Sequence, residues 1–389
     1  MSTLSDAARA ANVPIESVRR WLVDKALPLW LTTGVDWTSG GFEESLTLAG
    51  ERIPGQNKRV RVQARQIYTA SHTAVLGLHP DALAAARHGY DFLTRHGWNP
   101  EGGWVNLLSA TGEVRDARRD TYDHAFALLA LSWYYRASRD AGVLAWIERT
   151  VSSLDAVLSD GTGAYLESSP PQQPRRQNPH MHCFEAMLAA FEATGDSDYA
   201  RRAERLYNLL RERFFDPAKG ALREFYGDDW LPLAGPEGRV VEPGHHCEWV
   251  WLLDKFERAI SLDTSTMRRA LLDFAMMHGR HSGSRLLVDQ VDVDGKQLQT
   301  SQRLWPQTEA IKALLTRIER GDMSAWPDVS TFAHGLLDRF LAVEPVGIWH
   351  DHFGADGKLL NSFVPASSLY HLFVSFSELL RVVPARSTG

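Results

Sequence analysis

The sequence predicts an all-α fold, an (α/α)6 barrel of about twelve helices with short β-hairpins over its open end. Two observations predict it. Apolar helices alternate along the chain with amphipathic ones, and a polar residue recurs near the start of successive apolar stretches at spacings of 58 to 64 residues. Six such units in a ring would bring the N-terminal ends of the apolar helices to one mouth. The recurring residues, which would line a single pocket there, are Arg65, Asp123, His182, His245, Glu309 and His371.

The first helical segments, over residues 5–22, have the outline of a helix-turn-helix with a turn near Pro14. Trp21 and Leu22 instead follow a core-like pattern. Helices that lead directly into a barrel do not easily present a recognition helix. We therefore expect this segment to belong to the barrel wall.

Two kinds of helix are expected in the rest of the chain. Residues 124–135 contain no Asp, Glu, Lys or Arg, and residues 365–380 are apolar around most of a helical circumference. Such helices pack on both sides, so they are expected to form an inner ring. Residues 197–215 and 264–278 place apolar residues three and four apart, with arginines and acids between them. These helices are expected to form an outer ring with one face in water.

Glycine-containing segments with alternating apolar residues separate the outer helices from the next inner ones. Examples are residues 102–107, 221–226 and 348–357. The pattern predicts short hairpins. They would lie at the same end of the ring as the N-termini of the inner helices.

The composition favours a single domain over residues 1–389, because no linker or low-complexity run interrupts the chain. A net charge of −6 gives no electrostatic reason to expect nucleic acid or an anionic membrane as a partner. No run of about 18 apolar residues is present to span a bilayer. Two cysteines and the lack of a recognisable signal segment predict a cytoplasmic protein. The sequence leaves open whether the chain forms a homodimer.

Motifs spread over almost the whole chain resemble the N-acylglucosamine 2-epimerase superfamily, which includes mannose isomerases and cellobiose 2-epimerases. VQARQIY and the short roof loops are most similar to the mannose isomerase branch. The resemblance implies an enzyme that acts on a small monosaccharide without a cofactor. The motifs are GGFEE (40–44), VQARQIY (62–68), NPHMHCFEA (178–186), PGHHCEWVWLL (243–253), LWPQTEAIKA (304–313) and SSLYHLF (367–373).

The expected chemistry needs groups that transfer protons. Moving a carbonyl between C1 and C2 of an aldose requires ring opening, removal of a proton next to the carbonyl and stabilisation of the enediolate. Histidine suits these steps because its unperturbed pKa lies near ~6.5. The resemblance implies that His371 shuttles the proton between carbons and that His245 assists ring opening or, in an epimerase, protonates the other face. Glu248 lies three residues after His245, so we expect it to fix the tautomer of that imidazole.

Further residues are expected to hold the sugar and the developing negative charge. The resemblance implies that His182 and Asn178, which share one helix face, contact the ring oxygen and hydroxyl groups. An arginine fork suits O1 and O2 of the enediolate. Arg65 and Arg61 lie one turn apart and point the same way, so either can take that role.

Acids and aromatic residues complete the predicted site. Glu309 and Asp123 are expected to accept hydrogen bonds from sugar hydroxyls, although a buried structural role is an equal alternative for Asp123. The C–H face of a sugar stacks on aromatic rings, which are also ordinary core residues. The aromatic candidates are Tyr122, Trp305 and Trp349, with Trp104 and Trp249 beside them.

A metal site is an alternative, because His180, His182, His245, His246 and Glu248 offer enough ligands for zinc or manganese. However, His180 and His182 are two residues apart and project to nearly opposite faces of one helix. His246 lies about 100° around the helix from His245 and is expected to face a neighbouring helix. We therefore expect neither a metal nor another cofactor.

The sequence thus predicts an isomerase that interconverts D-mannose and D-fructose by proton transfer through a cis-enediolate. A 2-epimerase of mannose and glucose, or of an N-acylated hexosamine, is the alternative, because both reactions share the intermediate. A glycoside hydrolase would need two opposed carboxylates, for which only Glu248 and Glu309 are available. A sugar-binding protein without catalysis is a further alternative. The substituents of the sugar stay open.

Overall fold

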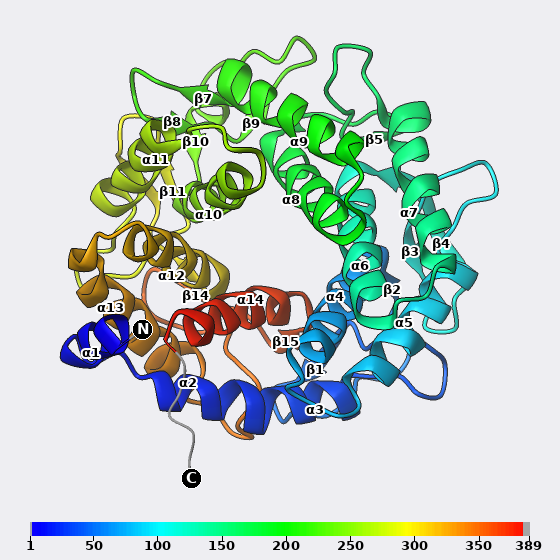
Figure 1. Cartoon of the computed structure of the whole chain (residues 1–389), viewed down its shortest axis with the longest axis horizontal. Coiled ribbons are helices and arrows are strands. Elements are labelled where there is room, and N and C mark those ends of the chain that lie inside the picture. Colours follow the sequence, from blue (N-terminus) through cyan, green and yellow to red (C-terminus); the bar gives the residue numbers. More distant parts are fainter. Residues whose placement is uncertain (1, 384–389) are drawn as a thin grey trace.

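The computed structural model describes residues 2–383 and shows two concentric rings of helices (Figure 1). The inner ring consists of α4 (Val60–Leu76), α6 (Thr121–Ser138), α8 (Gln177–Thr194), α10 (Pro243–Ile260), α12 (Leu304–Glu319) and α14 (Ser367–Val382). The outer ring contains α5 (Ala82–His96), α7 (Gly142–Ser153), α9 (Ser197–Leu209), α11 (Ser265–His278) and α13 (Trp326–Gly335). Its sixth member is α2 (Ile15–Trp21), which continues through a π-helical turn (Leu22–Ala26) into α3 (Leu27–Thr32). The predicted (α/α)6 barrel is therefore confirmed.

The two kinds of helix differ in burial as their sequences predict. In α6, 13 of the 18 residues are buried. In α9, only four of the 13 residues are buried, and arginines and acids occupy its exposed face. Apolar side chains of both rings form one continuous core cluster.

The N-terminal segment belongs to the barrel wall. Trp21 and Leu22 are buried in the core, and α1 (Ser2–Ala10) lies beside α13. The turn after α1 is fastened there, because the Ser330 hydroxyl donates to the Asn12 carbonyl at 3.0 Å. The outline of a helix-turn-helix in the sequence is therefore the start of the outer ring.

Short strands cover the N-terminal ends of the inner helices and join consecutive units. The strand just before each inner helix pairs antiparallel with a strand of the next unit, and the last pair closes the ring. The pairs are β2 (Lys58–Arg59) with β3 (Val105–Leu108), β4 (Val114–Asp120) with β5 (Ser168–Ser169), β6 (Arg175–Arg176) with β9 (Phe225–Tyr226), β10 (Val240–Val241) with β11 (Gln290–Asp292), β13 (Gln302–Arg303) with β14 (His352–Phe353), and β15 (Phe363–Pro365) with β1 (Ser45–Thr47).

The prediction of local hairpins is therefore correct only in part. Residues 102–107 contribute to the hairpin of β3 and β4. Within 221–226, β8 (Ala221–Leu222) pairs locally with β7 (Phe215–Asp216), whereas β9 pairs with β6 of the preceding unit. Residues 348–357 contain β14, whose partner β13 precedes α12. Local sequence patterns do not reveal such pairing between distant segments.

A repeated contact fastens this roof to the inner helices. The fourth residue of five inner helices accepts a hydrogen bond from a roof backbone N–H at 2.7 to 3.0 Å, with an imidazole Nε2 in His124, His180 and His246 and an amide oxygen in Gln63 and Gln307. Each histidine uses its Nδ1 on the backbone carbonyl four residues earlier. The N–H donors are those of Phe42, Trp104, Tyr165, Leu222 and Leu287. These side chains therefore fix the roof over the mouth.

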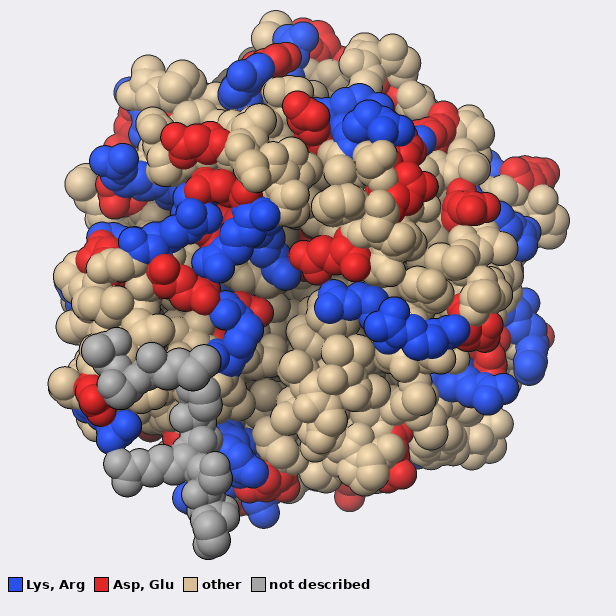
Figure 2. Space-filling view, in the orientation of Figure 1, with Lys and Arg blue, Asp and Glu red and all other residues tan. Residues whose placement is uncertain are grey.

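The surface agrees with the small net charge of the chain. Basic and acidic side chains lie beside one another over much of the face in Figure 2. Within residues 2–383, no helix combines the length and the apolar character needed to cross a bilayer.

Candidate active site

A cavity of about 350 Å³ lies where the N-terminal ends of the inner helices meet the roof strands. All six inner helices contribute to its wall, so the structure brings together residues that lie up to 306 positions apart in the sequence. The predicted site residues that line it are Arg65, Tyr122, Asn178, His182, His245, Glu248, Trp305 and His371. The other lining residues are Arg176, Glu224, Phe225, Glu242, Arg303, Asp351, Ser367 and Ser368.

His371 is a neutral histidine held by a carboxylate. Its Nδ1 lies 2.8 Å from Oε1 of Glu309. Burial holds the pKa of His371 well below its usual value, and the nearby Arg65 guanidinium acts in the same direction. A neutral imidazole that donates its Nδ1–H to Glu309 keeps Nε2 free to accept a proton. Glu309 itself does not line the cavity, so its role as a sugar contact is corrected to that of a partner of His371.

His245 differs from His371 in charge. Its Nδ1 lies 3.0 Å from Oε1 of Glu224 and 3.8 Å from Oε2 of Glu242. Burial alone would lower the pKa of His245, but these carboxylates outweigh burial and raise it to about 9. The imidazole is therefore a cation at neutral pH and can donate a proton. The predicted partner Glu248 is not bonded to it; Glu224, which lies 21 residues earlier on the roof, takes that place.

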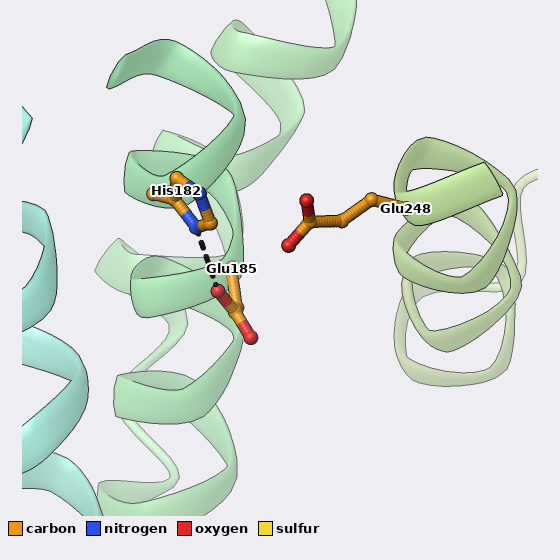
Figure 3. A group of neighbouring side chains, drawn as sticks. All are labelled: His182, Glu185 and Glu248. Atoms are coloured by element: carbon orange, nitrogen blue, oxygen red, sulfur yellow. Dashed lines mark hydrogen bonds and ion pairs between the residues drawn. The ribbon is translucent and has the colours of Figure 1, made fainter. Parts of the chain in front are cut away.

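A third buried group is formed by His182, Glu185 and Glu248 (Figure 3), of which His182 and Glu248 line the cavity. The His182 Nδ1 lies 3.1 Å from Oε2 of Glu185, which also accepts a hydrogen bond from the Tyr370 hydroxyl. Burial lowers the pKa of His182 to about 4. Glu248 points from α10 across to this pair. Burial and the nearby Glu309 raise the pKa of Glu248 to about 8, so Glu248 holds a proton at neutral pH.

The structure resolves which arginine reaches the cavity. The Arg65 guanidinium donates to the Tyr122 hydroxyl at 2.6 Å and to the Ser367 carbonyl at 3.3 Å. Arg61 does not line the cavity. Its backbone N–H and guanidinium lie 3.1 and 3.6 Å from Oδ1 of Asp123. Asp123 is completely buried and also accepts a hydrogen bond from Asn106, which favours the structural role that the sequence left as an equal alternative to a sugar contact.

The aromatic candidates also divide into residues that line the cavity and residues that lie in the core. Trp305 lies close to both histidines, with its ring centre 4.9 Å from that of His245 and 5.6 Å from that of His371. Trp349 is fully buried and stacks on Trp30 at 4.9 Å, away from the cavity. Its predicted sugar contact is therefore corrected to a core role. Trp104 and Trp249 are also completely buried and lie in the core.

Comparison with known proteins identifies the chain. The sequence profile of the N-acylglucosamine 2-epimerase family matches residues 40–375. The chain belongs to the N-acylglucosamine 2-epimerase family. It is 35% identical to a protein of Rhizobium meliloti named mannose-6-phosphate isomerase, over 92% of this chain and 95% of that protein. It is 29% identical to a D-mannose isomerase of Thermobifida fusca, over 89% of this chain and 92% of that protein.

Solved structures support the fold of this family member. The cellobiose 2-epimerase of Spirochaeta thermophila superimposes with a TM-score of 0.85 at 23% identity, and the alignment covers 98% of both chains. Identity at this level shows the shared barrel alone. With the family profile and the curated relatives, it establishes this chain as an enzyme of the sugar isomerase and epimerase type.

The metal alternative does not fit the histidines it requires. In this family member, both ring nitrogens of His180 and of His246 are engaged by the backbone. A deeper pair of groups, which share Glu248, offers ligand atoms within 4.8 Å of one another: His182, Glu185 and Glu248, and Glu248, Glu309 and His371. The Lys312 ammonium lies 2.6 Å from Oε2 of Glu309, so a cation of the protein already neutralises this acidic cluster.

Sequence reasoning missed Glu185 and Glu224, which contact His182 and His245. It also missed Lys312 and Tyr370, which contact the carboxylates of Glu309 and Glu185. The sequence spacing could have indicated two of these four residues. Glu185 follows His182 by three residues and Lys312 follows Glu309 by three, which places each pair on one helix face. No such spacing indicated Glu224. It reaches His245 only because β9 and the segment before it are folded over the mouth of the barrel.

Proposed function

We propose that this enzyme interconverts D-mannose and D-fructose by proton transfer through a cis-enediolate. The observation that carries the proposal is a pair of histidines in different protonation states, neutral His371 and cationic His245, both close to Trp305 in one cavity. A neutral base and a charged acid are the two groups that ring opening and proton abstraction require. The name of the Thermobifida fusca relative, D-mannose isomerase, supports this substrate.

Each step has a group in place. His245 donates its proton to the ring oxygen as the bond between C1 and that oxygen breaks, and neutral His182 takes up the proton that the O1 hydroxyl releases as it becomes the carbonyl. His371 then accepts the C2 proton at Nε2 and returns it to C1. Arg65 stabilises the negative charge that develops on O1 and O2. Glu248, which holds a proton, and His182 are available to exchange the hydroxyl protons of the enediolate.

Two buried oxygens in the cavity wall are ready to bind hydroxyl groups. Oδ1 of Asn178 and Oε1 of Glu248 have no hydrogen-bond partner within residues 2–383. A buried polar atom without a partner costs about 1–3 kcal/mol. A sugar hydroxyl at each position would remove that cost, which favours a polyhydroxylated ligand.

The charges of the cavity favour a sugar without a phosphate group. Arg176 is paired with Glu167 at 2.6 Å, and Arg303 is paired with Glu242 and Asp289 at 3.0 and 3.1 Å. A phosphate dianion needs cations that are free to bind it. We therefore propose that the free sugar is the substrate, unlike the phosphorylated sugar in the name of the Rhizobium meliloti relative.

Product analysis in deuterated water tests these proposals. With D-mannose we expect fructose that carries deuterium at C1 in part of the molecules. Glucose as the main product would establish the 2-epimerase instead. Complete retention of the substrate hydrogen, together with loss of activity in a chelator, would refute proton transfer. Mannose 6-phosphate should be a poor substrate; a kcat/KM above that of mannose would overturn the preference for the free sugar.

A further inference from the structure

Lys312 is a completely buried lysine directly behind the proposed base. It lies on α12, one turn after Glu309, and its Nζ is 2.6 Å from Oε2 of that residue. The other oxygen of the same carboxylate, Oε1, lies 2.8 Å from Nδ1 of His371. The three groups form a chain in which the carboxylate lies between an ammonium and an imidazole. The opposite side of the ammonium faces the Trp251 ring at 4.1 Å.

The surroundings make this lysine the local source of positive charge behind the histidines. Burying a lysine is costly unless it is paired, so its presence here needs an explanation. Neighbouring acids raise its pKa against the effect of burial, which keeps it charged. The titratable groups that act on Lys312 or Glu309 are His182 and Glu185 on α8, Cys247 and Glu248 on α10, and His371 on α14. Arg65 on α4 and Tyr370 on α14 act on the pair's partner, His371.

The charge on Glu309 decides the tautomer of His371. An ionised Glu309 only accepts, so His371 must place its proton on Nδ1 and leave Nε2 open. A protonated Glu309 could donate to Nδ1 instead, and the histidine proton would then move to Nε2, where it blocks the acceptor. Three carboxylates crowd this region, and Glu248 and Glu309 both have raised pKa values because of burial. Without a cation, Glu309 would be protonated readily.

We propose that Lys312 is a positioning residue, which keeps Glu309 ionised and thereby holds His371 in the tautomer with a free Nε2. The kinetic consequence rests on the proposed function, whereas the tautomer itself does not. Lys312 touches no substrate in this scheme and acts through two other side chains.

A pair of lysine variants tests the kinetic consequence. Lys312→Met removes the charge and keeps most of the volume. Lys255→Met is the matched control, because its Nζ lies 4.8 Å from the ring centre of the same Trp251 but pairs with Glu192 rather than with Glu309. For Lys312→Met we expect kcat to fall about 100-fold, which is the rate factor that a general base typically contributes. The KM of this variant should change less than about threefold. The acidic limb of its pH–rate profile should move to higher pH, since Glu309 must lose its proton first.

Lys312→Arg keeps the charge and should restore at least about a tenth of the wild-type kcat together with the wild-type acidic limb. Equal behaviour of Lys312→Met and Lys255→Met would overturn the proposal. A loss of kcat in Lys312→Met without any movement of the acidic limb would overturn it as well, because a purely structural defect predicts that result.

A measurement on the wild-type protein covers the case in which Lys312→Met does not fold. In ¹⁵N-histidine NMR spectra without substrate, the resonance that disappears in His371→Gln should show the neutral tautomer protonated at Nδ1 between pH 6 and 8. The tautomer protonated at Nε2 would refute the proposal. If mannose and fructose are not interconverted, the proposed function fails, whereas this spectrum still decides the role of Lys312.

Discussion

The charge of His245 depends chiefly on the roof carboxylate of Glu224, with smaller contributions from Glu242 and Glu248. The variant Glu224→Gln removes the carboxylate charge while keeping an oxygen that can accept the Nδ1–H. His182 shows what burial does without sufficient compensation, because its pKa falls to about 4. In the variant, the pKa of His245 should fall from about 9 to below its usual 6.5. At pH 7 the protonated fraction would then drop from about 99% to about 25% or less.

The assay is the initial rate of mannose isomerisation between pH 5 and 10. Because His245 must carry a proton, wild-type kcat/KM should fall as pH rises through about 9. In Glu224→Gln this basic limb should move below pH 6.5, and kcat/KM at pH 7 should fall at least about fourfold. Glu167→Gln is the matched control, because Glu167 also binds a cavity arginine from the roof but does not contact His245. A basic limb that stays near pH 9 in Glu224→Gln would refute the reasoning.

The stability of the folded protein should also depend on pH through the protonation of His245. The rise of the His245 pKa from 6.5 to about 9 corresponds to about 3 kcal/mol of interaction. A histidine pKa that is raised by folding stabilises the folded protein fully below the unfolded value, and this stabilisation is lost as pH rises through about 9. Glu224→Gln should therefore lower the Tm more at pH 6 than at pH 9.5. An equal loss at both pH values would show that the carboxylate charge contributes nothing to folding.

Three further variants test the rest of the site. His371→Ala should abolish exchange of the sugar hydrogen with deuterated water, and a variant that retains most of its turnover would remove His371 from the mechanism. Arg65→Lys should lower kcat by about 10- to 100-fold because a lysine cannot hold two oxygens as a fork, and a kcat near that of the wild type would contradict this role. His246→Ala should lower the free energy of unfolding by about 1–3 kcal/mol through the unpaired roof N–H, measured by urea denaturation, and unchanged stability would argue against that contact.

Much of the fold follows from the sequence because the burial of a helix determines how apolar and charged residues are spaced along it. An inner helix packs on both sides and excludes charge, as in residues 124–135, whereas an outer helix keeps a wet face. The pairing of the roof strands produces no such pattern in the sequence. Each strand is two to seven residues long, and its partner is chosen by the position of the neighbouring unit. The same reason explains why Glu224 could not be predicted.

The polar repeat in the sequence mixes two positions of the inner helix. Counted from the first residue of each inner helix, Arg65, His182 and Glu309 are sixth. His371 joins them because Ala366, just before α14, already has helical backbone angles. Asp123 and His245 are third, one turn earlier, where Asp123 binds the backbone N–H of Arg61.

The correct sixth residue of α10 is Glu248, and that of α6 is Phe126, which lies against the Arg65 guanidinium at 4.2 Å. A histidine at the fourth position, such as His180, binds the roof backbone instead. In a barrel of this kind, the type of residue therefore says less about function than its place within the first two helical turns. A shift of two positions separates a buried histidine that binds a roof strand from one that lines the cavity, as His180 and His182 show on the same helix.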